Sequence, residues 1–185
     1  MAQVSNLLSD NITTREATPV VQSASGEGAP GRLIHVDGLV TSLATDSANG
    51  TYSMVRLPTT AKLKCLELTN GAGTSSSAVD IGLFYVAPGI MPGKAASRVY
   101  NSSGQAADGV VDQDFFGSAV AVSSAQAKLD VINESATYTT AKRFQPLWKA
   151  VGLAKDPGGY FDIVLTITTE VTAAVPFYLE ATYVD

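Results

Sequence analysis

The sequence predicts an all-β protein, an antiparallel β-sandwich of jelly-roll type with one short helix near residues 145–152 and an extended N-terminal arm. From residue 32 onward, short runs alternate apolar and polar residues with the period of two that is typical of half-buried strands. These runs end at turn-forming residues, among them Asn49-Gly50, a strong hairpin signal. About eight such runs favour a two-sheet sandwich, with a jelly roll as the first choice and an immunoglobulin-like sandwich as the second.

Four strands are predicted in the first half of the chain, at residues 34–40, 51–57, 62–69 and 79–85. In the fourth run, Val79 and Ile81 fall on one face and Asp80 falls on the other. Between the third and fourth runs, residues 71–77 (GAGTSSS) read as a flexible loop.

The middle of the chain has weaker patterns. Residues 90–109 are rich in Gly, Pro, Ser and Asn and predict a long surface loop. Residues 112–124 indicate one helical turn that leads into a short strand, and residues 128–132 indicate a further extended segment.

One helix is expected in the body of the domain. Its apolar residues have helical spacing, at i, i+3, i+4 and i+7: Phe144, Leu147, Trp148 and Val151. Pro146 fits the first turn of this helix, and Gly152 ends it.

The last two predicted strands, residues 161–168 and 177–183, have the clearest alternation. The first places Ile163 on an apolar face and Asp162 on a polar face, and the second places Leu179 and Glu180 in the same way. Both strands therefore predict one buried and one solvated face.

Residues 1–31 form the predicted arm, and residues 32–185 form the predicted sandwich domain. The arm has no regular period, so it cannot form a core of its own, and it is either a solvated tail or an extended segment that orders against a neighbour. Its scattered apolar residues are the candidate assembly residues: Val4, Leu7, Leu8, Ile12, Val20 and Val21.

The composition excludes several function classes. A formal net charge of -5 gives no basic surface for nucleic acid. Cys65 is the single cysteine, so neither an intrachain disulfide nor a cysteine-based zinc site can form. We expect no membrane partner, because the longest apolar run, residues 83–87, is far shorter than the ~20 residues of a membrane helix. The absence of a secretory signal predicts assembly in the cytoplasm.

The candidate chemical groups are few. His35 is the only histidine, and Asp37 shares its face of a strand, but no nucleophile motif accompanies this pair, so a structural role is favoured. Asp112-Gln113-Asp114 lacks the glycine of a calcium loop and reads instead as a helix start or turn. We therefore expect no catalytic residue, no metal and no cofactor.

Two further features have weak functional interpretations. Residues 71–77 are glycine-rich but lack the lysine and following helix of a phosphate-binding loop. Trp148 could stack on a sugar ring, but its helical spacing with Phe144 favours a place in the core.

The sequences of several segments resemble those of small structural proteins of tailed bacteriophages. The resemblance covers most of residues 32–185 and leaves out the arm. It is carried by residues 50–64 (GTYSMVRLPTTAKLK), 79–85 (VDIGLFY), 112–116 (DQDFF), 147–153 (LWKAVGL) and 156–163 (DPGGYFDI). These segments are turns and strands without a catalytic signature, so the resemblance assigns no functional role to any of their residues.

Proteins of this kind look like capsid decoration, or cement, proteins. The resemblance therefore implies a non-enzymatic virion protein that binds the major capsid protein on the outside of the head and also binds itself as a homodimer or homotrimer. Assembly would take place in the host cytoplasm. Two alternatives remain: a tail or fibre module that recognises host glycans, and a hydrolase that uses His35 and Asp37.

Overall fold

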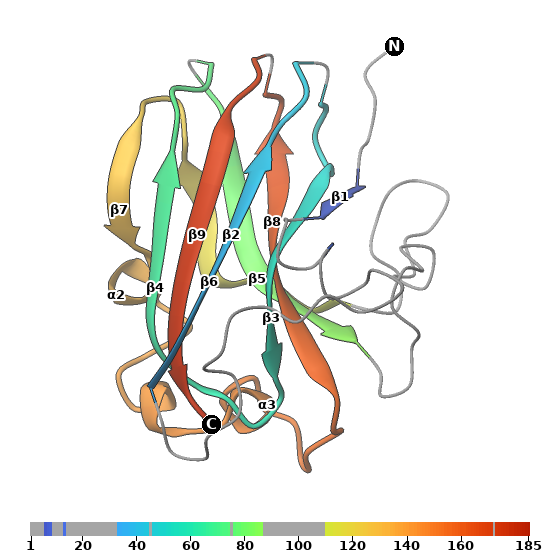
Figure 1. Cartoon of the computed structure of the whole chain (residues 1–185), viewed down its shortest axis with the longest axis vertical. Coiled ribbons are helices and arrows are strands. Elements are labelled where there is room, and N and C mark those ends of the chain that lie inside the picture. The colour runs from blue at the N-terminus through green and yellow to red at the C-terminus, as the bar shows by residue number, and fades with distance from the viewer. Residues whose placement is uncertain are drawn as a thin grey trace.

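The computed structural model shows two β-sheets packed face to face, with short helices at one end (Figure 1). The structure describes residues 6–8, 13, 33–44, 46–74, 76–86, 110–171 and 173–185. The predicted loop at residues 90–109 lies outside these ranges.

Nine strands and three short helical segments make up the described part. The strands are β1 (Asn6–Leu8), β2 (Leu33–Thr41), β3 (Thr51–Pro58), β4 (Lys62–Asn70), β5 (Ala78–Val86), β6 (Val110–Ala121), β7 (Gln126–Asp130), β8 (Tyr160–Thr169) and β9 (Pro176–Val184). The helical segments are α2 (Val131–Glu134), the 3-10 helix η2 (Lys142–Phe144) and α3 (Leu147–Ala150).

The strand order is that of a jelly roll. One sheet has the order β1-β3-β8-β5-β6 and the other has the order β2-β9-β4-β7. Every pairing is antiparallel except that of β1 with β3. The eight strands β2 to β9 thus form two interleaved four-stranded sheets, as in the two Greek keys of a jelly roll. The predicted all-β sandwich is confirmed, and its order is not that of an immunoglobulin domain.

The core lies between the two inner faces. Ile163 of β8 and Leu179 of β9 are fully buried there, as their alternation predicts. Aromatic rings join the sheets: the Tyr52 ring of β3 lies 5.8 Å from the Phe177 ring of β9. Sequence periodicity thus assigned the inner face of both late strands correctly.

The outer faces of the two sheets differ, and here one prediction is wrong. In β9 the residues between the core positions are partly exposed, as predicted. In β8 the second face is buried as well, because Asp162, Val164 and Thr166 are each less than 5% exposed. Strand β8 lies in the middle of its sheet, between β3 and β5, and Asp162 is paired with Arg56 of β3.

Residues 112–124 do not begin with a helical turn, which corrects that prediction. Residues 112–121 belong to β6, a strand of 12 residues whose pairing with β5 is broken by three register shifts. At one of these, β6 passes so close to β5 that a Cβ on Gly82 would lie 2.2 Å from the Gln113 carbonyl oxygen. Such irregularities disrupt the period of two from which strands are predicted.

The segment predicted to be extended at residues 128–132 is divided between two elements. Its first part belongs to β7, and Val131 and Ile132 begin α2 with both side chains buried. Lys128 has a positive φ of 53°, which marks the irregular pairing of β7 with β4.

The predicted helix is shorter than expected and is divided. Phe144 ends η2, the backbone at Gln145 is extended, and α3 begins after Pro146. The expected apolar stripe is therefore broken: Leu147 is buried, whereas Phe144 is 71% exposed. The helix end at Gly152 agrees with its φ of +95°.

The loop at residues 71–77 is held in place rather than free, in its described part. The Gly73 N–H donates to the Val122 carbonyl, and the Ser77 hydroxyl accepts from the Thr74 N–H at 3.1 Å. Because Ser77 is buried, this segment forms a fixed connection between the sheets.

Candidate assembly surfaces

The N-terminal arm contributes one described element, the strand β1. It pairs in parallel with β3 at the edge of the five-stranded sheet, with Leu7 opposite Tyr52 (Figure 1). Leu7 is partly buried and packs against the core. A segment of the arm can therefore order by strand addition to a sheet edge. The other assembly candidates, apart from the Leu8 backbone in β1, lie outside the described residues: Val4, Ile12, Val20 and Val21.

His35 and Asp37 share one face of β2, as the sequence predicts, but this face is in solvent. The His35 imidazole Nδ1 lies 3.3 Å from the Thr182 hydroxyl, and its Nε2 lies 3.7 Å from a Glu180 carboxylate oxygen. The His35 side chain is 54% exposed, so neither a cleft nor an excluded-water environment surrounds it. This arrangement offers no reacting site.

Asp112 and Asp114 lie on the edge strand β6 rather than at a helix start, which corrects that interpretation. The Asp114 N–H lies 3.4 Å from an Asp112 carboxylate oxygen. Partial burial and the neighbouring Asp114 raise the pKa of the Asp112 carboxyl. Across the described ranges, no three His, Cys, Asp or Glu side chains are grouped to hold a metal ion.

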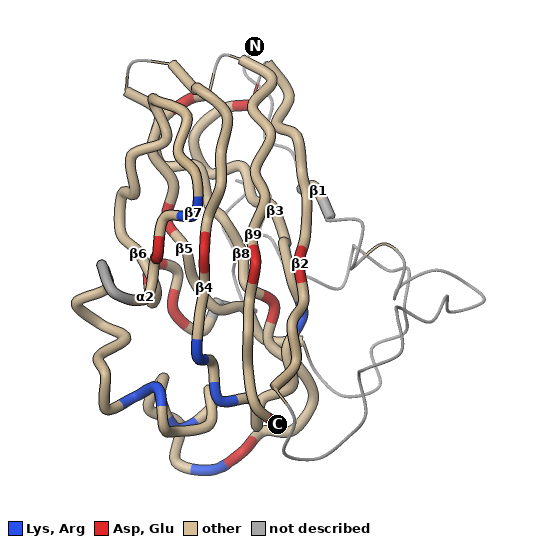
Figure 2. Tube along the Cα trace, turned by 60° about the vertical axis from the view of Figure 1, so that its left-hand side comes forward, with Lys and Arg blue, Asp and Glu red and all other residues tan. Residues whose placement is uncertain are grey.

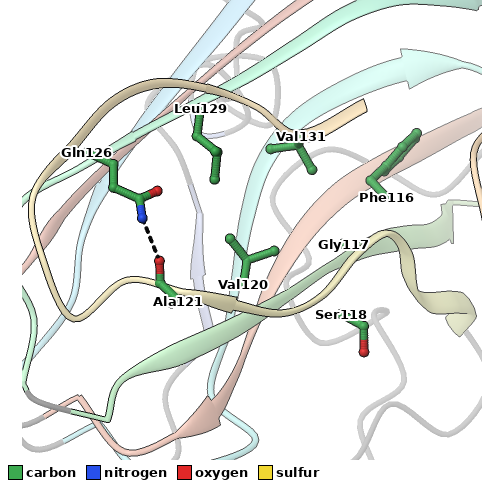
Figure 3. Close-up of a pocket in the computed structure, with 8 residues that line it drawn as sticks. All are labelled: Phe116, Gly117, Ser118, Val120, Ala121, Gln126, Leu129 and Val131. Carbon is green, nitrogen blue, oxygen red and sulfur yellow. Dashed lines mark hydrogen bonds between the residues drawn. The ribbon is translucent and has the colours of Figure 1, made fainter. Parts of the chain in front are cut away.

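A pocket of about 300 Å³ lies between β6 and β7, the edge strands of the two sheets on one side of the sandwich (Figure 3). Its walls combine apolar side chains, among them Val120, Leu129 and Val131, with polar groups such as Ser118 and Gln126. The Gln126 side-chain amide donates to the Ala121 carbonyl at 3.1 Å across one end. No ionisable side chain lines this pocket, so it provides shape but no reactive group.

Trp148 does not line this pocket. It is partly buried and packs against the core beside Leu147, which agrees with the core assignment rather than with an exposed sugar platform. The backbone N–H groups of Leu147 and Trp148 donate to the carbonyls of Ala61 and Thr59, which attaches α3 to the turn between β3 and β4.

Four carboxylates form a row across the outer face of the four-stranded sheet, one on each strand (Figure 2). Asp37 of β2 is opposite Glu180 of β9, Glu180 is also opposite Glu67 of β4, and Glu67 is opposite Asp130 of β7. We call these four residues the acidic row. With strands about 4.8 Å apart, the row is about 14 Å long.

The acidic row affects the groups beside it. Lys128 lies 3.3 Å from Glu67 and 3.5 Å from Glu180, and these carboxylates raise the pKa of its ammonium group. Burial, together with Glu67 and Asp130, raises the pKa of the Cys65 thiol. The thiolate form of Cys65 is thus disfavoured, and the cysteine is not an activated nucleophile.

Sequence reasoning did not identify the acidic row. Asp37 and Glu180 each occupy outward positions of predicted strands, which was the available signal. Their alignment with Glu67 and Asp130 depends on the register of three strand pairs. That register joins residues more than 60 positions apart, which local patterns cannot supply.

The end of the sandwich that carries the short helices is basic (Figure 2). Six of the eight Lys and Arg residues in the described ranges lie here, on the start of β4, on η2 and α3, and on the loop before β8. We call this set the basic end, and it comprises Lys62, Lys64, Lys142, Arg143, Lys149 and Lys155. The acidic side chains beside it are those of Asp156 and Asp185, which accept hydrogen bonds from the hydroxyls of Thr59 and Thr60.

Comparison with known proteins reveals similarity in structure only. No family model matches the chain, and no curated protein matches its sequence. A chain from the capsid of Ralstonia phage GP4 is similar over 98% of both chains, with a TM-score of 0.59 and 12% identity. A chain from the capsid asymmetric unit of cyanophage Pam1 covers 91% of this chain at 10% identity, with a TM-score of 0.46. The protein therefore has the fold of a phage capsid chain over almost its whole length.

No helix in the described ranges is long and apolar enough to cross a membrane.

Proposed function

We propose that this protein is a structural component of a bacteriophage virion, a decoration protein that binds the outer surface of the head and stabilises contacts between major capsid protein subunits. The observation that carries this proposal is the jelly roll shared end to end with a chain of a phage capsid. The resemblance of residues 32–185 to phage structural proteins supports the same role.

The surfaces fit a protein that works by docking. The described part has an exposed sheet face, a basic end and an arm segment that adds to a sheet edge, whereas His35 and Asp37 lie in open solvent. A contact of this kind can be weak in one copy, because many copies on one shell act together.

The arm is assigned the main contact with the shell. Within the described residues, β1 pairs with β3 over three residues, a short pairing that another strand edge could replace. On the particle, arm residues would pair with an exposed strand of a neighbouring major capsid protein, and the sandwich would project outward.

The test adds the purified full chain to particles that lack it and counts bound copies by mass spectrometry. A decoration protein binds in numbers comparable to those of the major capsid protein and is digested by protease on intact particles. Deletion of residues 1–31 should leave a folded sandwich that no longer binds the shell. A truncated chain that occupies shells fully would show that the arm assignment is wrong.

A point variant separates the arm from the rest of the chain. Leu7→Ser removes an apolar side chain that β1 would offer to the shell, while Leu43→Ser changes an exposed leucine on the sandwich and serves as the control. We expect Leu7→Ser to lower shell occupancy and Leu43→Ser to leave it unchanged. Absence of binding by the unmodified chain itself would overturn the decoration role.

A further inference from the structure

Exposed apolar side chains gather at the basic end. In the described ranges the exposed large apolar residues number six, and four of them lie at this end: Leu33, Phe144, Leu153 and Tyr160. Leu33 is opposite Val184 of β9, as Lys62 is, and Phe144 has the Lys64 ammonium 4.7 Å from its ring centroid. Exposed apolar side chains that lie together within a polar rim mark an interaction surface.

The positive charge of this surface indicates the charge that its partner surface should carry. Six cationic residues lie at this end with the apolar ones, against the carboxylates of Asp156 and Asp185. The whole chain, in contrast, has a net charge of -5, so this end is opposite in sign to the rest. A partner surface should therefore be acidic and should offer apolar contacts.

The same chain carries such a surface. The acidic row holds four carboxylates with Lys128 as the cation among them, on an outer sheet face where Asp37 and Leu39 are exposed. Leu39, two residues from Asp37, is 45% exposed and provides an apolar border. The acidic row and the basic end lie at different heights along the sandwich (Figure 2), so one copy can present both at once.

We propose that the basic end of one copy docks on the acidic row of a second copy, with the exposed apolar side chains packed against Leu39 and its neighbours. Because the two surfaces differ, the contact is heterologous and repeats from copy to copy into a ring or a row. The inference rests on the proposed function only in placing this contact on a shell, since self-association can be measured in solution.

The test is sedimentation velocity of the full chain over a range of concentrations, at about 0.1 M and about 1 M salt, where the Debye length falls from ~10 Å to ~3 Å. We expect concentration-dependent association that weakens at least roughly tenfold at high salt. A chain that stays monomeric at low salt, or an association that salt does not weaken, overturns the proposal.

Charge reversals identify the surfaces. Lys149→Glu with Lys155→Glu reverses two exposed cations of the basic end, and Asp37→Lys with Glu67→Lys reverses two members of the acidic row. Each pair should weaken association at least about tenfold, which is ~1.4 kcal/mol. The chain with all four substitutions should associate again, because the charges are complementary in the opposite sense.

Controls separate this contact from general charge effects. Asp114→Lys with Glu170→Lys makes the same change in net charge as the acidic-row pair, at two exposed positions outside both surfaces, and it should leave association unchanged. If the chain with all four charge reversals stays monomeric while circular dichroism shows that it is folded, the proposed contact between these two surfaces is wrong. Binding of the unmodified chain to phosphatidylserine vesicles or duplex DNA without self-association assigns the basic end to another partner and also overturns the proposal.

Discussion

In the five-stranded sheet the side chains of β8 are buried on both faces, whereas in the four-stranded sheet those of β2 alternate strictly between buried and exposed. The polar groups follow this difference. Asp162 of β8 is 1% exposed and is paired with the Arg56 guanidinium at 2.7 Å, while the carboxylates of the acidic row remain in contact with water.

The five-stranded sheet therefore has its central strand buried on both faces, whereas the four-stranded sheet presents one face to solvent. Buried polar groups need partners inside the protein, and Asp80 of β5 accepts hydrogen bonds from the Gln113 amide and the Ala119 N–H. Side chains on the outer face of the four-stranded sheet have no such requirement. This face can therefore vary in charge, which makes it the natural place for contacts between copies.

The largest effect is expected when a carboxylate is placed on each outer face. Val164→Asp buries a charge on the five-stranded sheet, where Val164 is 1% exposed, so the chain should fail to fold or lose several kcal/mol, about 3–5. Leu39→Asp, on the other sheet, should change the free energy of unfolding by less than ~0.5 kcal/mol. Urea unfolding of both variants measures the contrast, and equal losses would contradict it.

A smaller effect is expected from ion pairs. Arg56→Ala leaves the Asp162 carboxylate buried without its guanidinium partner, and it should cost roughly 3 kcal/mol. Lys128→Ala removes an exposed ammonium from Glu67 and Glu180 and should not change the melting temperature measurably. Thermal unfolding of the two variants side by side compares them. Similar melting temperatures for both would remove the distinction between the sheets.

A further effect, confined to alkaline pH, concerns the core that the two sheets share. Burial raises the pKa of Tyr138 to about 12, and burial with the Asp46 carboxylate raises that of Tyr52 still further. Unfolded tyrosines ionise near pH 10, so stability is fully present below about pH 10 and falls as pH rises toward 12. Each tyrosine contributes a loss of about 1.4 kcal/mol per pH unit.

Urea unfolding between about pH 9 and about pH 12 measures how the free energy of unfolding depends on pH. Absorbance at about 295 nm follows tyrosine ionisation over the same range. Tyr138→Phe should reduce the slope of the free energy of unfolding against pH by the contribution of one tyrosine. It also removes the hydrogen bond from the Tyr138 hydroxyl to the Leu63 carbonyl. An unchanged slope would mean that Tyr138 ionises in the folded state at its ordinary pKa.

Local sequence patterns predicted the strands that pair regularly. Ile163 and Leu179 were assigned to the core because period-two alternation survives wherever one face of a strand is buried. Residues 112–124 were misassigned because bulges break that alternation, and Phe144 was misassigned because Pro146 and the extended Gln145 divide the helix.

The sequence by itself determined that this chain is an all-β sandwich and which residues of its regular strands face the core, because strand formation and inner-face burial depend on neighbouring residues. Only the tertiary structure decided the jelly-roll order, the burial of the second face of β8, and the alignment of Asp37, Glu67, Asp130 and Glu180. These features depend on which distant strands pair and in what register, and a register is set by packing between segments that are far apart in the chain.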